Sequence, residues 1–252
     1  MIKPNDIIAD MHTHTIFSQH AYSTVKENIE AAKKNKIKYL AITDHFYGNG
    51  DDLDRKNEAS RIVYCDKRIN TVEKDITIIG SAEFNLGQKI DNWNKIKNIK
   101  WKPIGLHNWF ISTQDLSLEE LYNLFKEASN KHNAFAHIER EIHKIAHGKY
   151  NDNLTSEVKQ FFKEIVILAA RKDVFLEVNE SSLITNEKGG ANRLRFWLEY
   201  AKKQQCKICL GTDAHYCMEV GNFSNAIKLL NEMNYPKELI LNCNKDLIES
   251  IL

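Results

Sequence analysis

The sequence has no long apolar run. Among its 252 residues the longest uninterrupted apolar stretch is Ile165–Ala170. A membrane-spanning helix needs about 20 apolar residues, and Met1–Asp10 lacks the apolar centre of a secretory signal peptide. We therefore expect a cytoplasmic protein without membrane contact.

Cysteine is scarce, and linker-like segments are absent. The 5 cysteines are an odd number, scattered along the chain, which does not resemble a disulfide framework and fits a reducing compartment. Cys206 and Cys209 have the spacing of a redox or zinc pair, but on a strand residues three apart point to opposite faces, so we interpret the spacing as structural. Proline-rich or serine-rich linkers and repeats are also absent, so residues 1–252 are predicted to form one domain.

Neither sign of charge is in excess. The 35 Lys and Arg residues against 34 Asp and Glu residues leave a formal net charge of +1. A nucleic-acid-binding surface needs clustered positive charge, and no basic block extends beyond a few residues. Nucleic acid is therefore not expected as a partner.

Short apolar, β-branched runs alternate with longer amphipathic stretches along the chain. The runs are Ile7–His12, Ile37–Thr43, Ile76–Glu83, Pro103–His107, Ala134–His137, Val174–Asn179 and Lys207–Thr212. Helices are expected between them, at 24–35, 57–73, 117–131, 155–171, 191–204, 222–233 and 245–251. The polar segments 138–153 and 180–190 are interpreted as loops. This alternation is typical of β-α units around a parallel sheet, and the length suits a single α/β barrel.

Two of the expected helices begin with a capping box. Thr24-Val-Lys-Glu27 and Ser117-Leu-Glu-Glu120 each place a hydroxyl three residues before a carboxylate. The two side chains satisfy free amide groups of the first turn. These starts make the helices at 24–35 and 117–131 the clearest of the set.

Metal-ligand residue types stand at the ends of six predicted strands. In Asp10-Met-His12-Thr-His14, residues i and i+2 of a strand point to the same side and can present two imidazoles to one cation. The other strand-end ligands are His45, Glu83, His107, His137, Asp213 and His215. In a parallel barrel these ends form one rim, so the side chains should converge there. Core packing would explain one buried histidine, but not ligands that repeatedly end a strand.

Several ordered motifs together resemble the PHP (polymerase and histidinol phosphatase) family, in particular its stand-alone bacterial phosphatases. They are Asp10–His14, His20–Thr24, Ala41–His45, Leu176–Asn179 and Gly211–His215. The resemblance extends along essentially the whole chain. It implies a distorted seven-stranded (β/α) barrel, similar to a TIM barrel, and a site for three divalent metal ions. Imidazole-rich sites suit zinc, manganese or iron, with zinc placed first.

The resemblance also implies which residues hold each ion. The three sets are His12, His14, Glu83 and Asp213; Glu83, His107 and His137; and His20, His45 and His215. Every one of these positions holds a competent ligand, which disfavours a degenerate scaffold.

The expected reaction is hydrolysis of a small phosphomonoester by a metal-held hydroxide, since clustered divalent ions lower the pKa of bound water from about 16 to near 7. Glu83, Asp213 and His215 are the candidate catalytic residues. Arg193 or Arg195 is the candidate phosphate-binding group, although a solvated first helical turn explains both arginines equally well.

Further polar residues flank these positions. Asp10, Asp44 and Asn179 are expected to orient imidazole N–H groups, Asn179 alternatively bonding a loop. The histidines that match no family ligand, His132, His143 and His147, are expected at the surface.

Four alternatives stay open: a histidinol-phosphatase, a phosphodiesterase or nuclease, an amidohydrolase and a metal-binding scaffold without activity. The near-neutral charge argues against a nuclease, and Glu83 stands where amidohydrolases usually have a modified lysine. Ile138–His143 replaces the proline- and glycine-containing turn expected in relatives, so 138–153 does not indicate the substrate.

Overall fold

The computed structural model describes residues 1–47, 58–90, 96–107, 115–150, 154–185 and 190–252. Its strands are β1 (Ala9–Thr13), β2 (Tyr39–Ile42), β3 (Thr77–Gly80), β4 (Phe84–Asn85), β5 (Pro103–Gly105), β6 (Ala134–Phe135), β7 (Phe175–Asn179) and β8 (Ile208–Gly211). Each predicted apolar run contains a strand. The short β4 is additional and directly follows the third run.

Seven helices of the described chain agree with the predicted ones to within a few residues. They are α1 (Val25–Lys34), α2 (Glu58–Val72), α4 (Leu118–Ala128), α6 (Ser156–Lys172), α8 (Gly190–Lys203), α9 (Ser224–Glu232) and α10 (Lys245–Glu249). Both capping boxes are confirmed: Thr24 N–H donates to Glu27 Oε2 at 2.7 Å, and Ser117 N–H donates to Glu120 Oε2 at 2.8 Å. Among the described residues, no helix has the length and apolar character to cross a membrane.

Two short helices, α5 (Ile138–Glu141) and α7 (Glu180–Thr185), lie in segments predicted to be loops. That prediction is wrong here, because helices of one or two turns are too short to show a 3.6-residue periodicity. Contacts with a distant part of the chain, rather than a local sequence pattern, stabilise α7. The buried Glu180 carboxylate accepts hydrogen bonds from Asn225 N–H at 2.9 Å and Ala226 N–H at 2.8 Å, at the start of α9.

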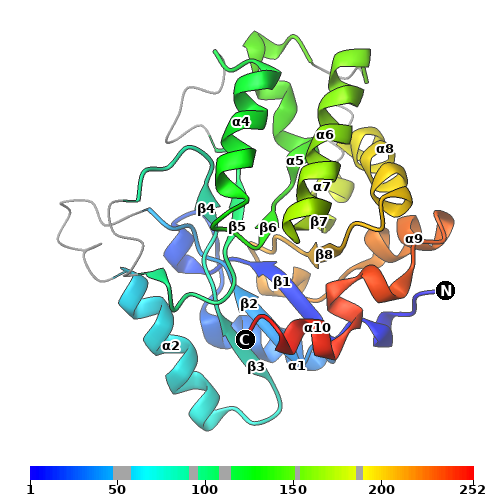
Figure 1. The fold of residues 1–252 in the computed structure, drawn as a ribbon. Coiled ribbons are helices and arrows are strands. Elements are labelled where there is room, and N and C mark those ends of the chain that lie inside the picture. Colours follow the sequence, from blue (N-terminus) through cyan, green and yellow to red (C-terminus); the bar gives the residue numbers. More distant parts are fainter. Residues whose placement is uncertain (48–57, 91–95, 108–114, 151–153, 186–189) are drawn as a thin grey trace.

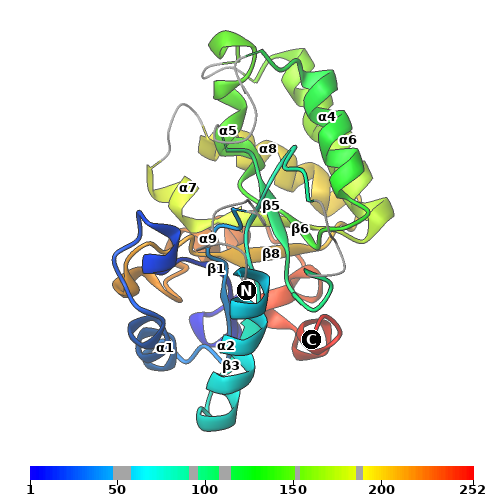
Figure 2. The same ribbon diagram turned by 90° about the vertical axis from the view of Figure 1, so that its left-hand side faces the viewer.

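The strands form a parallel ring. One sheet has the order β1-β2-β3 and the other β4-β5-β6-β7-β8. Thr13 at the end of β1 pairs with Ala214 beyond β8, and Ser81 after β3 pairs with Trp101 ahead of β5. The segment from β3 to β4 therefore counts as one strand of the ring, so that the eight assigned strands form a seven-stranded barrel. The distorted seven-stranded (β/α) barrel is confirmed, with α4, α6 and α8 on one side of the strands and α1 and α2 on the other (Figures 1 and 2).

The buried apolar residues form two clusters. The larger one lies between the strands and the surrounding helices. The smaller one takes alternate residues of a strand, such as Tyr39 and Ala41 of β2, and fills the barrel interior. Leu241 and Ile248 belong to this inner cluster. The C-terminal α10 therefore closes the barrel at the end where the strands begin, and the candidate ligands occupy the other end.

The cysteine pair is divided between the two clusters. Cys206 belongs to the outer cluster and Cys209 to the inner one, and both are free thiols. The structural interpretation of this spacing is confirmed.

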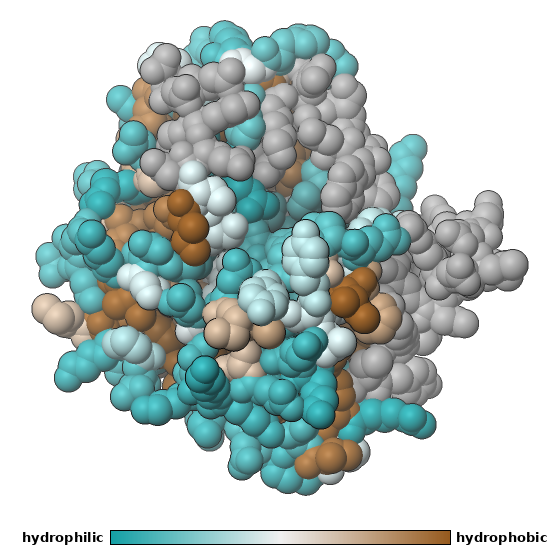
Figure 3. Space-filling view, turned by 180° about the vertical axis from the view of Figure 1, so that it is seen from behind, coloured by the Kyte–Doolittle hydropathy of each residue, from teal (hydrophilic) through white to brown (hydrophobic). Residues whose placement is uncertain are grey.

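The surface matches the balanced composition. Viewed from behind, the described residues are mainly hydrophilic, with separate hydrophobic patches (Figure 3). No large apolar face is visible on this side of the described chain.

Candidate metal centre

The paired histidines at the end of β1 face each other. His12 Nε2 lies 3.0 Å from His14 Nε2, and both side chains are buried. The pairing of β1 with β2 shifts register between Asp10 and Thr13, and such irregularities re-aim side chains next to functional sites. The predicted presentation of two imidazoles on one side of the strand is present.

Glu83 turns its two carboxylate oxygens toward different histidines. Oε1 lies 2.9 Å from His137 Nε2 and 3.6 Å from His107 Nε2. Oε2 lies 3.0 Å from His45 Nδ1 and 3.5 Å from His12 Nε2. A carboxylate in this arrangement has the geometry to bridge two cations.

Asp213 and His215 complete the cluster from the far end of the chain. Asp213 Oδ1 lies 3.2 Å from His14 Nε2. The ring centroid of His215 is 4.5 Å from that of His14 and 4.6 Å from that of His20. The His20 ring in turn stacks on His45 at 5.1 Å. All nine predicted ligand residues are therefore brought together at one end of the barrel.

The donor set fits a cluster of metal ions. Ligand atoms lie within 4.8 Å of one another in four groups: His12, His14 and Asp213; His12, Glu83 and His137; His45, Glu83 and His107; and His14, His45 and His215. His20 lies beside the last group rather than within it. The buried Glu83 Oε2 accepts no hydrogen bond from the described residues, which is costly unless a cation compensates it.

The protonation states of Glu83, Asp213 and His14 suit metal binding. Burial opposes ionisation of Glu83, but the neighbouring histidines hold its pKa well below its usual range. Burial opposes ionisation of Asp213 as well, and Arg140 with the paired histidines holds that pKa well below its usual range. Burial lowers the pKa of His14 well below its usual value. Ionised carboxylates and a neutral imidazole are the forms that coordinate metals.

Glu177 supports the cluster and was not predicted to do so. Its Oε1 lies 2.6 Å from His12 Nδ1, and its Oε2 accepts from His137 N–H at 2.9 Å. Asn179 Nδ2 donates to Glu177 Oε2 at 3.2 Å, so Asn179 holds this carboxylate and does not orient an imidazole directly. The available signal was a single carboxylate inside the apolar run Val174–Asn179.

Asp10 and Asp44 support the site mainly through other groups. Asp10 Oδ2 accepts from Gly221 N–H at 2.9 Å, which ties β1 to the segment that follows β8. Asp44 Oδ1 accepts from Ser18 Oγ–H at 2.6 Å, and Ser18 Oγ lies 2.9 Å from His14 Nδ1. Asp44 thus reaches an imidazole through an intervening hydroxyl group.

Arg140, which contacts a candidate ligand in the described structure, is not one of the two arginines predicted from sequence. Arg193 is buried and its Nε donates to Glu139 O at 2.8 Å. Arg195 forms an exposed ion pair with Glu232 at 2.7 Å. Arg140 of α5 instead donates from Nη1 to Asp213 Oδ2 at 2.8 Å. The described structure therefore brings Arg140 to the ligands.

The prediction of surface positions is wrong for two of the three remaining histidines. His132 and His143 are buried, whereas His147 is exposed. The ring of His132 packs edge-on against Phe84 at 5.1 Å. His143 Nδ1 donates to Arg140 O at 2.6 Å, which fixes the end of α5.

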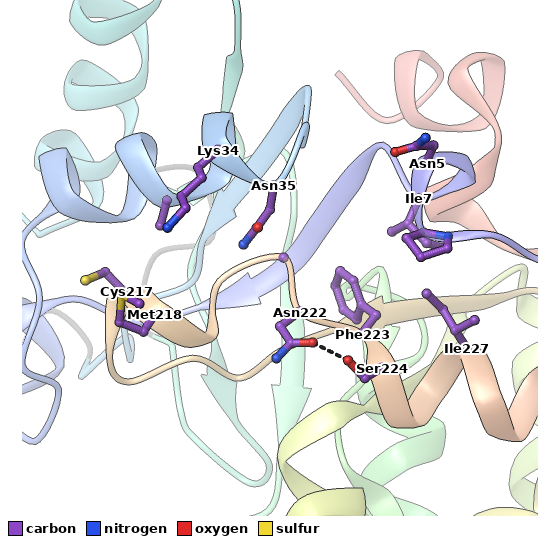
Figure 4. A pocket seen from close by; sticks show the side chains of 13 residues that line it. Asn5, Ile7, Lys34, Asn35, Cys217, Met218, Asn222, Phe223, Ser224 and Ile227 are labelled. Atoms are coloured by element: carbon purple, nitrogen blue, oxygen red, sulfur yellow. Dashed lines mark hydrogen bonds between the residues drawn. The ribbon is translucent and has the colours of Figure 1, made fainter.

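A separate cavity of about 360 Å³ lies between the 3₁₀ turn Pro4–Asp6, the end of α1 and the segment 217–227 (Figure 4). Ser224 Oγ–H donates to Asn222 Oδ1 at 2.6 Å at its wall (Figure 4). The residues that line it include none of the nine ligands. The cavity is therefore separate from the cluster of candidate ligands at the strand ends.

Known proteins share both the sequence pattern and the fold. The family model described as PHP domain matches residues 10–181. A probable phosphatase of Clostridium acetobutylicum is 26% identical, over 97% of this chain and 94% of its own. A probable phosphatase of Photobacterium profundum is 30% identical, over 93% of this chain and 89% of its own.

A solved structure shows the same fold. The histidinol phosphate phosphatase of Lactococcus lactis, crystallised with zinc, L-histidinol and phosphate, superposes with a TM-score of 0.65 at 18% identity. The match covers 91% of this chain and 95% of that one. Asp213 and His215 lie beyond the residues matched by the family model but within the extent of these longer matches.

Proposed function

The chain belongs to the PHP domain family, and on that premise we propose that it hydrolyses phosphate monoesters with a cluster of divalent metal ions. The observation that carries the proposal is the convergence of nine imidazole and carboxylate side chains at one end of the barrel. Relatives named probable phosphatases, aligned over nearly their full length, support a phosphate ester as the substrate.

Three ions, zinc foremost and manganese or iron as alternatives, would be held by the nine ligand residues. When bound, such ions lower the pKa of coordinated water to near 7 and offset charge on phosphate oxygens. Two of the structural groups share Glu83, which supports a bridging role for this carboxylate. His20 would complete the group formed by His45 and His215.

The chain's own residues would handle the protons and the phosphate. Asp213 Oδ2 is anchored by Arg140 while Oδ1 faces the paired histidines, so Oδ1 is placed to accept a proton from the attacking water. His215 Nδ1 donates to Asp213 O at 2.8 Å, so His215 would act through Nε2 as a metal ligand. The guanidinium of Arg140, rather than that of Arg193 or Arg195, would bind phosphate oxygens.

We propose direct attack of water on phosphorus, without a covalent enzyme intermediate. Ser18, a hydroxyl close to the cluster, is buried and donates to Asp44, so it is not placed as a nucleophile. Hydrolysis of a chiral phosphate ester should therefore invert the configuration at phosphorus. Retention of configuration would contradict direct attack.

Metal removal and reloading test the function. Metal-stripped protein loaded with zinc, manganese or iron should regain turnover of a phosphomonoester and should melt at a higher temperature. The substrate panel includes histidinol phosphate and phosphodiesters, which tests the two alternative esterase activities. A scaffold would gain melting temperature alone, and no turnover of any monoester in metal-loaded protein would end the proposal.

Two substitutions connect turnover to the cluster. His14→Ala and Glu83→Ala each remove a ligand and should abolish turnover in reloaded protein. Arg195→Met, on the outer surface beside Glu232, is the matched control that should retain it.

A further inference from the structure

Ser18 lies between a histidine ligand and a buried carboxylate. Ser18 Oγ–H donates to Asp44 Oδ1 at 2.6 Å, and Ser18 Oγ lies 2.9 Å from His14 Nδ1. The same oxygen accepts from His45 N–H at 3.2 Å. All four residues are buried, so bulk water does not compete for these contacts.

The number of hydrogens available decides how these contacts are made. A hydroxyl group has one hydrogen to donate and two lone pairs. The short distance to Asp44 is typical of a hydroxyl that donates to an ionised carboxylate. The backbone N–H of His45 can only donate and occupies one lone pair. The second lone pair faces His14, whose Nδ1 must therefore carry a hydrogen.

We propose that Ser18 is a positioning residue that holds His14 in the tautomer with its hydrogen on Nδ1, which keeps the Nε2 lone pair directed into the ligand cluster. His14 Nε2 lies 3.2 Å from Asp213 Oδ1 and 3.0 Å from His12 Nε2, so Nε2 is the atom that faces the other ligands. The benefit to metal binding rests on the proposed function, whereas the tautomer itself does not.

The other histidine of the pair has a direct version of this arrangement. His12 Nδ1 contacts the Glu177 carboxylate at 2.6 Å. At His14 the hydroxyl group of Ser18 lies between the imidazole and the Asp44 carboxylate and connects the two. Because Ser18 also accepts from His45 N–H, one side chain sets the spacing of two ligands that follow different strands, β1 and β2.

NMR of metal-free protein containing isotope-labelled histidine tests the tautomer, since the two ring nitrogens differ when only one is protonated. His14→Gln identifies the His14 signals by their loss. Wild-type protein should show His14 protonated at Nδ1 alone. A wild-type His14 protonated at Nε2 would overturn the proposal, whatever any variant does.

Variants test the role of the hydroxyl group. Ser18→Ala should mix or reverse the His14 tautomers, and Ser18→Thr, which keeps a hydroxyl, should restore the wild-type pattern. Thr15→Val is the matched control, because Thr15 Oγ1–H donates to Asp44 Oδ2 at 2.6 Å and its loss leaves Ser18 in place. An unchanged His14 pattern in folded Ser18→Ala would contradict the proposal.

Competition for zinc with a coloured chelator measures how much Ser18 contributes to the metal affinity of the protein. Ser18→Ala should bind zinc about 10- to 100-fold more weakly, the usual effect of losing a group that orients a ligand. Ser18→Thr and Thr15→Val should stay close to wild type, and unchanged affinity in Ser18→Ala would contradict the role in metal binding. If the tautomer and affinity change as expected but no protein hydrolyses a phosphomonoester, the proposed function fails and the role of Ser18 stands.

Discussion

Glu177 Oε1 lies 2.6 Å from His12 Nδ1, and both side chains are buried. Burial alone would lower the pKa of His12, but Glu177, Glu83 and Asp213 raise it well above its usual value. Glu177 also accepts from the backbone of His137. One carboxylate from β7 therefore fixes histidines at the ends of β1 and β6, on separate parts of the barrel.

Glu177→Gln should weaken metal binding by about 10- to 100-fold, because the amide removes the charge that orients the His12 imidazole. Zinc competition and metal content after purification measure the effect. Turnover at saturating zinc should recover in part, since the nine ligand residues are unchanged.

Glu180→Gln is the control for this change. Glu180 is also buried, but its carboxylate holds the start of α9 through Asn225 and Ala226. The Glu180→Gln variant should have a lower melting temperature, whereas its zinc affinity should stay near that of wild type. Equal losses of zinc affinity in the two variants would show that Glu177 acts only through stability.

The convergence of the candidate ligands at the strand ends was predictable because of where these residues stand in the sequence. His45, Glu83 and His107 each end an apolar run, and the carboxyl ends of parallel strands meet at one rim. The barrel followed from the same alternation of short runs and amphipathic stretches. Position along the chain was thus enough to place these side chains together.

Glu177 and Arg140 were missed for different physical reasons. Glu177 lies within a strand rather than at its end, so its apolar neighbours hide it. Arg140 lies in a segment without periodicity, and its partner Asp213 is 73 positions away. Packing decides which face of a short helix contacts a distant carboxylate, and no local sequence pattern indicates that face. The same holds for the burial of His132 and His143.

Arg140→Met should lower kcat/KM for phosphomonoesters by roughly 10- to 100-fold, as expected when a charge-assisted hydrogen bond of about 1.5–3 kcal/mol is lost. Steady-state kinetics at saturating metal measure it. Arg140→Lys should recover only part, since lysine cannot make the paired contacts of a guanidinium.

Arg193→Met and Arg195→Met compare the arginines predicted from sequence. Arg195 pairs with Glu232 on the exposed surface, so its loss should leave kcat/KM unchanged. A larger loss of kcat/KM in Arg195→Met than in Arg140→Met would show that Arg195, as predicted from the sequence, is the phosphate-binding arginine.

Gly105→Ala should disrupt the cluster. An added Cβ would lie 2.6 Å from His137 Cε1 and 2.7 Å from Glu83 Oε1, so these side chains must move. We expect zinc affinity to fall more than 10-fold, with turnover falling as well. Gly190→Ala is the control, because its Cβ would come no closer than 4.0 Å to Ser182 O. Wild-type zinc binding by Gly105→Ala would mean that His137 and Glu83 are not both ligands.

The buried His132 should make the fold sensitive to mild acid. Burial lowers the pKa of His132 to about 3, from an ordinary value of 6.5. Between these values the unfolded chain binds a proton that the folded chain does not, so the free energy of unfolding falls as the pH drops below 6.5. The slope approaches about 1.4 kcal/mol per pH unit, which gives a loss of about 2 kcal/mol between pH 7 and pH 5.

Urea unfolding of metal-free protein at several pH values measures this dependence. His132→Gln cannot gain the proton, so its stability should fall less steeply from pH 7 to pH 5 than that of wild type. His147→Gln is the control, because His147 is exposed and its replacement should leave the wild-type slope unchanged. Carboxylates contribute equally in all three proteins, so the difference in slope isolates His132. Parallel curves for wild type and His132→Gln would mean that His132 titrates alike in the folded and unfolded chains.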